Sequence, residues 1–459
     1  MEAKFLKYAF LDFIFKRNAR ERTFFCIASA GFGTRLATLI STMFAADMLG
    51  ANFKFIWKFN YANRLHDIPS VKEMFKEEFI EKHHLESPPN DINYKVINRV
   101  FSAKDLRKIK TSRHTQIQTL NNPLSDCNIH SEYFKKLPFN NQYLDVINYV
   151  NSLPVHKYGI HIRRGDIAYD IYRCGGVFIE KLLPLPVLEL LIKKLQPHTP
   201  LIIGEFVISD LNNFLKYNLP NTLRYEYPYS ENKSLVDFFD LCLIGRCQMI
   251  FGGFSKFLEC GTLINNCKYT DINYFLSLDE INRVVIDFIN KTDITGNKIE
   301  ISLACDYYVS CNHKILSKND IYELAKKAFL NDPQNPAYFI KLVSHYLENF
   351  GIDYATNFIN STTTLQSIAN VLLDISYSHI HDNTNMFNNL THSKGYLNQN
   401  DWKILKRYSG ASNWIDFILG LYYYCNTFKY EGLNYLKTSS EVVLDKQLKN
   451  KFSRLINLE

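Results

Sequence analysis

The stretch from Arg22 to Trp57 restricts the fold more than any other part of the chain. Residues 22–28 form an apolar run that predicts a buried strand, residues 29–34 contain two glycines typical of a tight loop, and residues 35–49 carry apolar side chains at helical spacing. A second apolar run at residues 53–57 predicts another strand. Strand, glycine-rich turn, helix and strand make a βαβ unit, which predicts a parallel sheet covered by helices.

A short strand that ends in two guanidinium groups occupies Tyr158–Asp166. Ile160 and Ile162 alternate with His161 and Arg163, so the two isoleucines are expected to bury one face of the strand while the other two side chains point the opposite way. The carboxyl ends of strands in open α/β sheets are where ligands bind. This stretch therefore predicts a ligand-binding strand end.

The residues that close this strand are suited to a phosphate-bearing ligand. The planar guanidinium groups of Arg163 and Arg164 match pairs of phosphate oxygens. Gly165 permits the backbone to turn close to the ligand, and Asp166 can hold an arginine in place or accept a substrate hydroxyl. The alternatives are a surface loop whose arginines pair with nearby carboxylates, and an exposed Arg-Gly-Asp adhesion motif, against which the preceding buried strand argues.

The pattern His161-x-Arg-Arg-Gly-Asp166 after an apolar strand resembles the signature of the fucosyltransferase superfamily, which includes α1,2-, α1,6- and protein O-fucosyltransferases. The resemblance implies two Rossmann-like lobes in the GT-B arrangement, GDP-fucose as the donor and no catalytic metal. It also implies that Arg163 contacts the donor diphosphate, with His161 and Arg164 beside it. The resemblance covers about residues 22–285 and ends beyond Asn290.

The loop from Gly31 to Arg35 also carries the resemblance, although it matches a dinucleotide fingerprint only in part. Gly31 and Gly33 let backbone N–H groups approach a ligand at a helix N-terminus, and Arg35 can reach over the same site. The corresponding loop of the family faces the cleft and has Asn where this chain has Thr34. A structural turn without a ligand is the alternative.

A third stretch follows the predicted strand at residues 248–251. The Gly252-Gly253 turn precedes a helix that starts near Ser255, and a hydroxyl with free N–H groups at a helix N-terminus forms an anion nest. Ser255 and Phe257 resemble the family's Ser-x-Phe element, which touches the donor phosphates. Asp237 matches an acidic residue that contacts the nucleotide. The alternative is a helix N-cap and a solvent-exposed acid.

An inverting transferase needs a general base and stabilisation of the leaving diphosphate. Arg163 is the expected electrostatic catalyst, and Asp166 and Glu205 are the candidate bases. Glu205 ends the predicted strand at residues 201–204, where the family often has Thr-Asp-Asp.

Composition excludes several other classes of protein. The net charge of +7 is spread along the 459 residues, which suits anionic ligands or an anionic membrane surface and does not predict nucleic-acid binding. The ten cysteines include no Cys-x-x-Cys pair and several lie in apolar runs, which predicts buried free thiols in a reducing compartment. Cys305, Cys311 and His313 lack a fourth ligand, so no metal site is expected.

No apolar run reaches the roughly 18 residues that a membrane span needs. The aromatic segment at residues 5–15 is interrupted by charges, so it is expected to form either a helix packed on the first domain or an interfacial helix at the inner membrane. A signal peptide is not expected, and the predicted location is cytoplasmic or peripheral at the inner face of the plasma membrane.

From Ser317 onward the apolar spacing is helical, and residues 325–355 resemble a tetratricopeptide-type hairpin. A second hairpin is predicted at residues 414–436. This tail is expected either to form a dimer or partner surface or to cap the catalytic lobes.

The predicted fold class is α/β, with a GT-B-like pair of Rossmann-like lobes and an all-α C-terminal domain. The expected domains are an acceptor-side lobe at residues 1–150, a donor-side lobe at 151–300 and a helical, tetratricopeptide-like extension at 317–459. The predicted function is inverting, metal-independent transfer of fucose from a GDP-sugar to an acceptor glycan in bacterial capsule or lipopolysaccharide synthesis. The alternatives are another donor, such as GDP-heptose or GDP-mannose, and a non-catalytic scaffold of a polysaccharide assembly complex.

Overall fold

The computed structural model describes most of the chain in segments. The described residues are 22–28, 31–57, 68–88, 95–97, 114–117, 127–164, 167–168, 174, 179–205, 222–228, 231–253, 255–291, 298–382, 396–426, 429–439 and 446–456. The chain divides into two compact units. The first comprises residues 1–161, 197–204 and 223–271, and the second comprises residues 162–196, 205–222 and 272–459. The domain boundaries expected near residues 150 and 300 stay a prediction.

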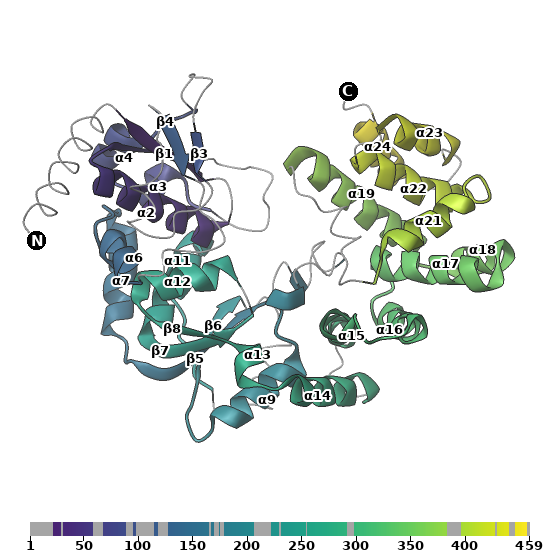
Figure 1. Cartoon of the computed structure of the whole chain (residues 1–459), viewed down its shortest axis with the longest axis horizontal. Coiled ribbons are helices and arrows are strands. Elements are labelled where there is room, and N and C mark those ends of the chain that lie inside the picture. The colour runs from purple at the N-terminus through teal and green to yellow at the C-terminus, as the bar shows by residue number, and fades with distance from the viewer. Residues whose placement is uncertain are drawn as a thin grey trace, which may run out of the picture. The chain divides into compact units, whose positions relative to one another are not determined.

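The first unit contains a four-stranded sheet (Figure 1), and the order of its strands is β2-β1-β4-β3. Its strands are β1 (Thr23–Ala28), β2 (Asn52–Trp57), β3 (Lys95–Ile97) and β4 (His114–Ile117). β1 pairs in parallel with both β2 and β4, and β3 pairs in parallel with β4. Helix α2 (Phe32–Leu49) connects β1 to β2, so the predicted βαβ unit is confirmed.

The ends of α2 follow from its glycines. Gly31 stands in extended conformation before the first turn, and Gly50 adopts the left-handed conformation, with φ of 63°, that ends the helix. The N–H of Gly50 donates to the carbonyl oxygen of Asp47 at 3.1 Å. The apolar face predicted from the sequence is buried, because Leu36, Leu39 and Ile40 are all fully inaccessible. Burial of this face attaches α2 to the sheet.

The second sheet has the order β6-β5-β7-β8 and consists of β5 (His156–Arg163), β6 (Leu201–Glu205), β7 (Cys247–Gly252) and β8 (Lys268–Asp271). β5 pairs in parallel with β7, and β7 pairs in parallel with β8. The chain leaves β5 for β6 on one side and later returns to β7 on the other. This reversal is a topological switch point, and open α/β sheets bind ligands at the carboxyl ends of the strands beside such a point.

Helices of the first unit cover these sheets. They are α3 (Val71–Met74), α4 (Glu77–His83), α6 (Cys127–Lys135), α7 (Asn141–Ser152), α11 (Lys233–Leu243), the 3₁₀ turn η3 (Ile244–Arg246) and α12 (Lys256–Asn265). α2 and α12 pack against each other, and α11 packs on α7.

The second unit is helical in its described part. Its elements are the 3₁₀ turn η2 (Ile179–Lys181), α9 (Leu185–Leu195), α13 (Ile272–Phe275), α14 (Leu278–Asn290), α15 (Lys298–Asn312), α16 (Lys318–Asn331), α17 (Pro336–Phe350), α18 (Ile352–Ser361), α19 (Leu365–Asp382), α21 (Gln399–Arg407), α22 (Asn413–Cys425), α23 (Lys429–Thr438) and α24 (Lys446–Ile456). The helical tail predicted beyond residue 317 is confirmed (Figure 1). Its tetratricopeptide-like character stays a prediction.

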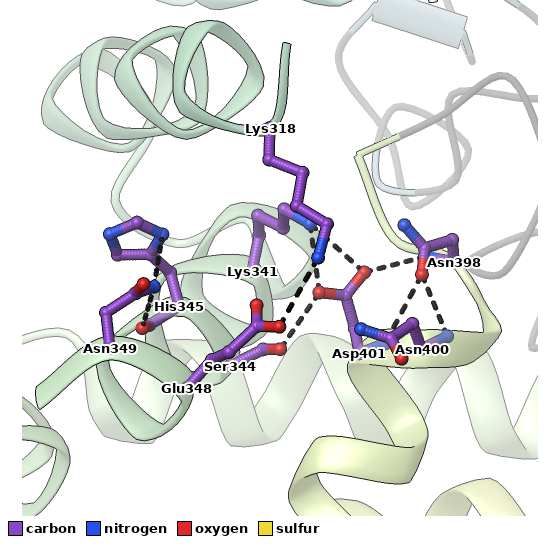
Figure 2. Close-up of polar contacts among 9 residues, drawn as sticks. All are labelled: Lys318, Lys341, Ser344, His345, Glu348, Asn349, Asn398, Asn400 and Asp401. Carbon is purple, nitrogen blue, oxygen red and sulfur yellow. Dashed lines mark hydrogen bonds and ion pairs between the residues drawn. The ribbon is translucent and has the colours of Figure 1, made fainter. Parts of the chain in front are cut away.

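Asp401 fastens α21 to α17 inside this helical region (Figure 2). Its side chain is 3% exposed, and it accepts hydrogen bonds from Lys341 Nζ at 2.9 Å and Ser344 Oγ at 2.9 Å. It also accepts the backbone N–H of Asn398 at 2.9 Å and so completes a capping box at the start of α21. One carboxylate thus caps its own helix and holds the neighbouring one.

Two parallel α/β sheets followed by helices confirm the predicted fold class. None of the helices in the described ranges is long and apolar enough to cross a membrane. The predicted N-terminal helix at residues 5–15 lies outside those ranges. Of the nine cysteines whose side chains the structure describes, eight are buried, as the sequence predicted.

Candidate functional site

Two of the stretches singled out in the sequence meet where α2 and α12 begin. A Cβ atom added at Gly33 would lie 2.6 Å from the Cα atom of Phe257 and 3.0 Å from the carbonyl oxygen of Lys256. The backbones of the two first turns are therefore in direct contact, and any side chain at position 33 would collide with them. Each helix presents unsatisfied N–H groups and a partial positive charge at this end.

His161 brings the third stretch to the same place. Its ring stacks on the ring of Phe257, with centroids 5.7 Å apart and planes inclined by 25°. A Cβ atom at Gly252 would lie 3.0 Å from the carbonyl oxygen of His161, so β5 and β7 approach closely at this level. His161 is only 5% exposed, whereas the sequence predicted only that it pointed away from the isoleucines. Ile160 and Ile162 are buried as expected.

Ser255 is the N-cap residue of α12, as predicted, but its hydroxyl does not cap the helix. The side chain is 2% exposed, and its Oγ atom has no hydrogen-bond partner among the described residues. An N-cap serine ordinarily accepts a hydrogen bond from the second or third N–H of its helix. A buried hydroxyl without a partner costs about 1–3 kcal/mol. Its position at a helix N-terminus is suited to a ligand group, most favourably an anion.

Arg35 adds a fixed positive charge to the first turns of these helices. It lies on α2 and is 1% exposed, with its guanidinium carbon 5.4 Å from the centroid of the Trp57 ring. Burial lowers the pKa of Arg35 to about 10, so the group is still charged at neutral pH. Gly31, just before α2, has open space where a Cβ atom would lie. The surroundings of α2 and α12 therefore favour a negatively charged ligand.

Arg163 and Asp237 stand on elements that adjoin this site. Arg163 is half-buried and is the last residue of β5, two positions beyond His161. Asp237 is half-buried on α11. Burial raises the pKa of Tyr143 on α7 to about 12, and the charge of Asp237 adds to the rise. Gly253 is half-buried and directly follows β7. The predicted ligand contacts of these three residues stay predictions.

Arg164 has a different environment from the one the sequence analysis gave it. Its side chain is completely buried, forms an ion pair with Glu300 and donates to the carbonyl oxygen of Leu183 at 2.9 Å. This placement favours a structural role over the ligand contact predicted for Arg164. Sequence reasoning missed Glu300, whose only visible signal is an acidic residue in the first turn of a helix.

The candidate general bases are not placed by the described residues. Gly165 and Asp166 lie outside them, and Glu205 ends β6 with only its backbone described. Across the described segments, no three His, Cys, Asp or Glu side chains come together as a metal site would require. The assignment of a base stays a prediction.

Comparison with known proteins gives structural likeness and no sequence relative. No protein-family model matches the chain, and no curated protein matches it. POFUT1 in complex with GDP is similar over 55% of this chain and 98% of its own, with 10% identity and a TM-score of 0.34. NodZ fucosyltransferase from Bradyrhizobium is similar over 53% of this chain and 92% of its own, with 12% identity and a TM-score of 0.34.

Arabidopsis thaliana FUT1, as a variant in complex with GDP, is similar over 55% of this chain and 70% of its own, with 12% identity and a TM-score of 0.33. The chain thus resembles solved fucosyltransferases over little more than half its length. Because these TM-scores are below 0.5, the likeness carries no argument about function.

Proposed function

We propose that this protein is a glycosyltransferase that takes its sugar from a GDP-sugar. The observation that carries the proposal is the buried hydroxyl of Ser255, which has no partner among the described residues and stands at a helix N-terminus. The backbone contact between Gly33 and Phe257 brings a second helix N-terminus beside it. Convergent N–H groups, a hydroxyl and the charge of Arg35 are what a diphosphate needs.

The reaction places its main electrostatic demand on this site. When the bond between the sugar and the donor breaks, negative charge develops on the departing diphosphate. Preorganised N–H groups and guanidinium groups stabilise that charge, and each well-placed donor contributes about 3 kcal/mol. This role suits Ser255, Arg35 and the first turns of α2 and α12. Arg163, at the end of β5, is the strongest candidate for direct contact with the diphosphate. These cationic groups can supply the positive charge without a metal ion.

The finer parts of the proposal rest on the His161-to-Asp166 motif. We infer that the sugar is fucose, that the acceptor is a glycan of a bacterial surface polysaccharide, and that transfer inverts the anomeric centre. Inversion requires one base to take the proton of the acceptor hydroxyl. Asp166 and Glu205 are the proposed bases. A cytoplasmic protein in peripheral contact with the inner membrane is consistent with such an acceptor.

Nucleotide binding tests the donor class first. Thermal unfolding is measured with GDP, UDP and CDP at equal concentrations, and only GDP is expected to raise the midpoint, because ligands that bind the native state stabilise it. A rise with UDP or CDP and none with GDP would refute the donor class. Transfer is then measured by mass spectrometry with GDP-fucose, GDP-mannose and GDP-heptose, and a preference for either of the last two would replace fucose.

Arg163→Ala tests the catalytic assignment. Loss of one transition-state donor is expected to lower kcat by about 100-fold to 1,000-fold. Arg283→Ala is the matched control, because Arg283 is exposed on α14 and its removal is expected to leave kcat unchanged. Full turnover by the Arg163→Ala enzyme would remove Arg163 from the mechanism.

A further inference from the structure

A buried ion pair joins the end of β5 to the first turn of α15. Arg164 directly follows β5 and has no exposed surface, and Glu300 is 3% exposed. The Nη2 atom of Arg164 donates to Glu300 Oε1, while Nη1 donates to the carbonyl oxygen of Leu183 at 2.9 Å. Glu300 stands in the first turn of α15, where the helix dipole favours a carboxylate. The planar guanidinium is therefore held at two of its nitrogens by groups from two separate segments.

Other contacts attach the chain that follows β5 to the same helices. The N–H of Ala168 donates to the carbonyl oxygen of Arg164 at 2.6 Å. Cys174 is 1% exposed and belongs to the hydrophobic core formed by the helices from α17 onward. The 3₁₀ turn η2 packs against α15, and Lys194 on α9 forms an ion pair with Glu280 on α14 at 2.6 Å. The segment after β5 is thus built into the helical region.

The ion pair has a direct consequence for Arg163. Consecutive side chains of extended backbone point to opposite sides, so the orientation of Arg164 sets the side to which Arg163 points. Arg164 cannot turn without breaking its buried ion pair with Glu300, and breaking a buried ion pair is strongly destabilising. A displacement of about 1 Å at a group that binds the transition state can cost on the order of 100-fold in rate. The position of Glu300 therefore bears on how well Arg163 can stabilise the transition state.

We propose that Glu300 is a positioning residue, which acts through Arg164 to fix the end of β5 and the direction of Arg163. The helices after residue 298 are then an integral part of the transferase, in addition to any partner surface they offer. The expected effect on catalysis rests on the proposed function. The constraint on the end of β5 rests on geometry alone.

Three variants test it. Glu300→Gln keeps the size of the side chain and an acceptor oxygen but removes the charge. Arg164→Met combined with Glu300→Met removes both charges of the pair, a replacement of a kind that other proteins tolerate with full folding. Glu280→Gln is the control, because it makes the same chemical change in an ion pair of the same unit while Gln can still serve in the capping box at Ser277.

Hydrogen exchange of residues 158–164 measures the constraint directly. Exchange is expected to be faster in Glu300→Gln and in the double variant than in the wild-type protein or in Glu280→Gln. With the preferred GDP-sugar, kcat is expected to fall about tenfold to 100-fold in both variants, while KM changes less than about threefold. The double variant should recover the thermal midpoint of unfolding without recovering kcat, which separates positioning from stability.

Two results would overturn the inference. One is unchanged exchange at residues 158–164 in both variants, and the other is full kcat in the double variant. A wild-type protein that neither binds GDP nor transfers a sugar would refute the proposed function instead, and the exchange rates would still decide whether Glu300 fixes the strand.

Discussion

The backbone of Phe257 occupies the space that a side chain at Gly33 would need, with a Cβ-to-Cα distance of 2.6 Å. One residue belongs to the first turn of α2 and the other to the first turn of α12. Their contact brings together the N-terminus of α2, which follows a strand of the first sheet, and the N-terminus of α12, which follows a strand of the second sheet. Electrostatically this pairing is unfavourable without an anion, because both helix ends carry partial positive charge.

Gly33→Ala is expected to lower the free energy of unfolding by about 1–3 kcal/mol, since backbone atoms of α12 must move to admit the methyl group. The displacement should also weaken GDP binding. Gly31→Ala is the matched control, because Gly31 has open space at its Cβ position and a φ of −60° that alanine adopts freely. Its effect should stay within about 0.5 kcal/mol. Urea denaturation with and without GDP measures the stability and the GDP binding of each variant. Equal effects of the two substitutions would contradict the close contact between Gly33 and Phe257.

Ser255→Ala is expected to affect stability and binding in opposite directions. Without nucleotide, the variant should be as stable as the wild-type protein or slightly more stable, because it removes a buried hydroxyl that lacks a partner. The Kd for GDP should rise by about tenfold to 100-fold, as expected for a hydrogen bond to a charged group. Calorimetric titration and thermal unfolding check the two effects.

Ser344→Ala provides the contrast to that substitution. Ser344 is buried as deeply, but its hydroxyl donates to Asp401 at 2.9 Å. The Ser344→Ala variant should lose about 1 kcal/mol of stability and bind GDP as tightly as the wild-type protein does. A loss of stability in Ser255→Ala comparable to that in Ser344→Ala would show that the Ser255 hydroxyl is satisfied within the protein.

Asp401→Ala is expected to destabilise the helical region by about 3–5 kcal/mol, because it leaves Lys341 without its buried partner and removes the capping box of α21 (Figure 2). Lys318→Ala breaks the Lys318–Glu348 pair of the same region, in which the lysine is 81% exposed. That change should cost less than about 1 kcal/mol. Chemical denaturation followed by circular dichroism compares the two, and similar losses would contradict the difference in burial.

His130 is expected to make the protein sensitive to mild acid. It is 1% exposed on α6, and burial lowers its pKa to about 4. Since the unfolded chain has the higher pKa, unfolding takes up a proton between roughly pH 6.5 and pH 4, and stability falls as the pH falls through this range. The loss attributable to His130 should reach about 2 kcal/mol near pH 5.

The measurement compares the free energy of unfolding at pH 7 and pH 5. His130→Gln should show a smaller difference between the two pH values than the wild-type protein. Phe134→Leu, a substitution of another buried side chain on α6, should lower stability equally at both. An unchanged pH dependence in His130→Gln would mean that the imidazole is accessible to protons in the folded protein.

Patterns that lie close together in the sequence predicted the elements well. The glycine-rich turn before α2, the start of α12 at Ser255 and the helices on either side of Pro336 were all visible, because capping, periodicity and glycine conformation act over a few residues. The alternation in β5 predicted the burial of Ile160 and Ile162 but not that of His161. That ring is buried by Phe257, whose position depends on the packing of α12.

The amino-acid sequence by itself determined the first βαβ unit, the strand that ends at Arg163 and the helical tail, and it singled out the glycines, the serine and the arginines of one candidate site. Only the tertiary structure showed that Arg164 is engaged in a buried ion pair, since it meets Glu300 from a distant helix. Local patterns record what neighbouring residues do to the backbone. The burial of a charge and the identity of its partner depend on which surfaces the folded chain brings together, and that information is spread over the whole sequence.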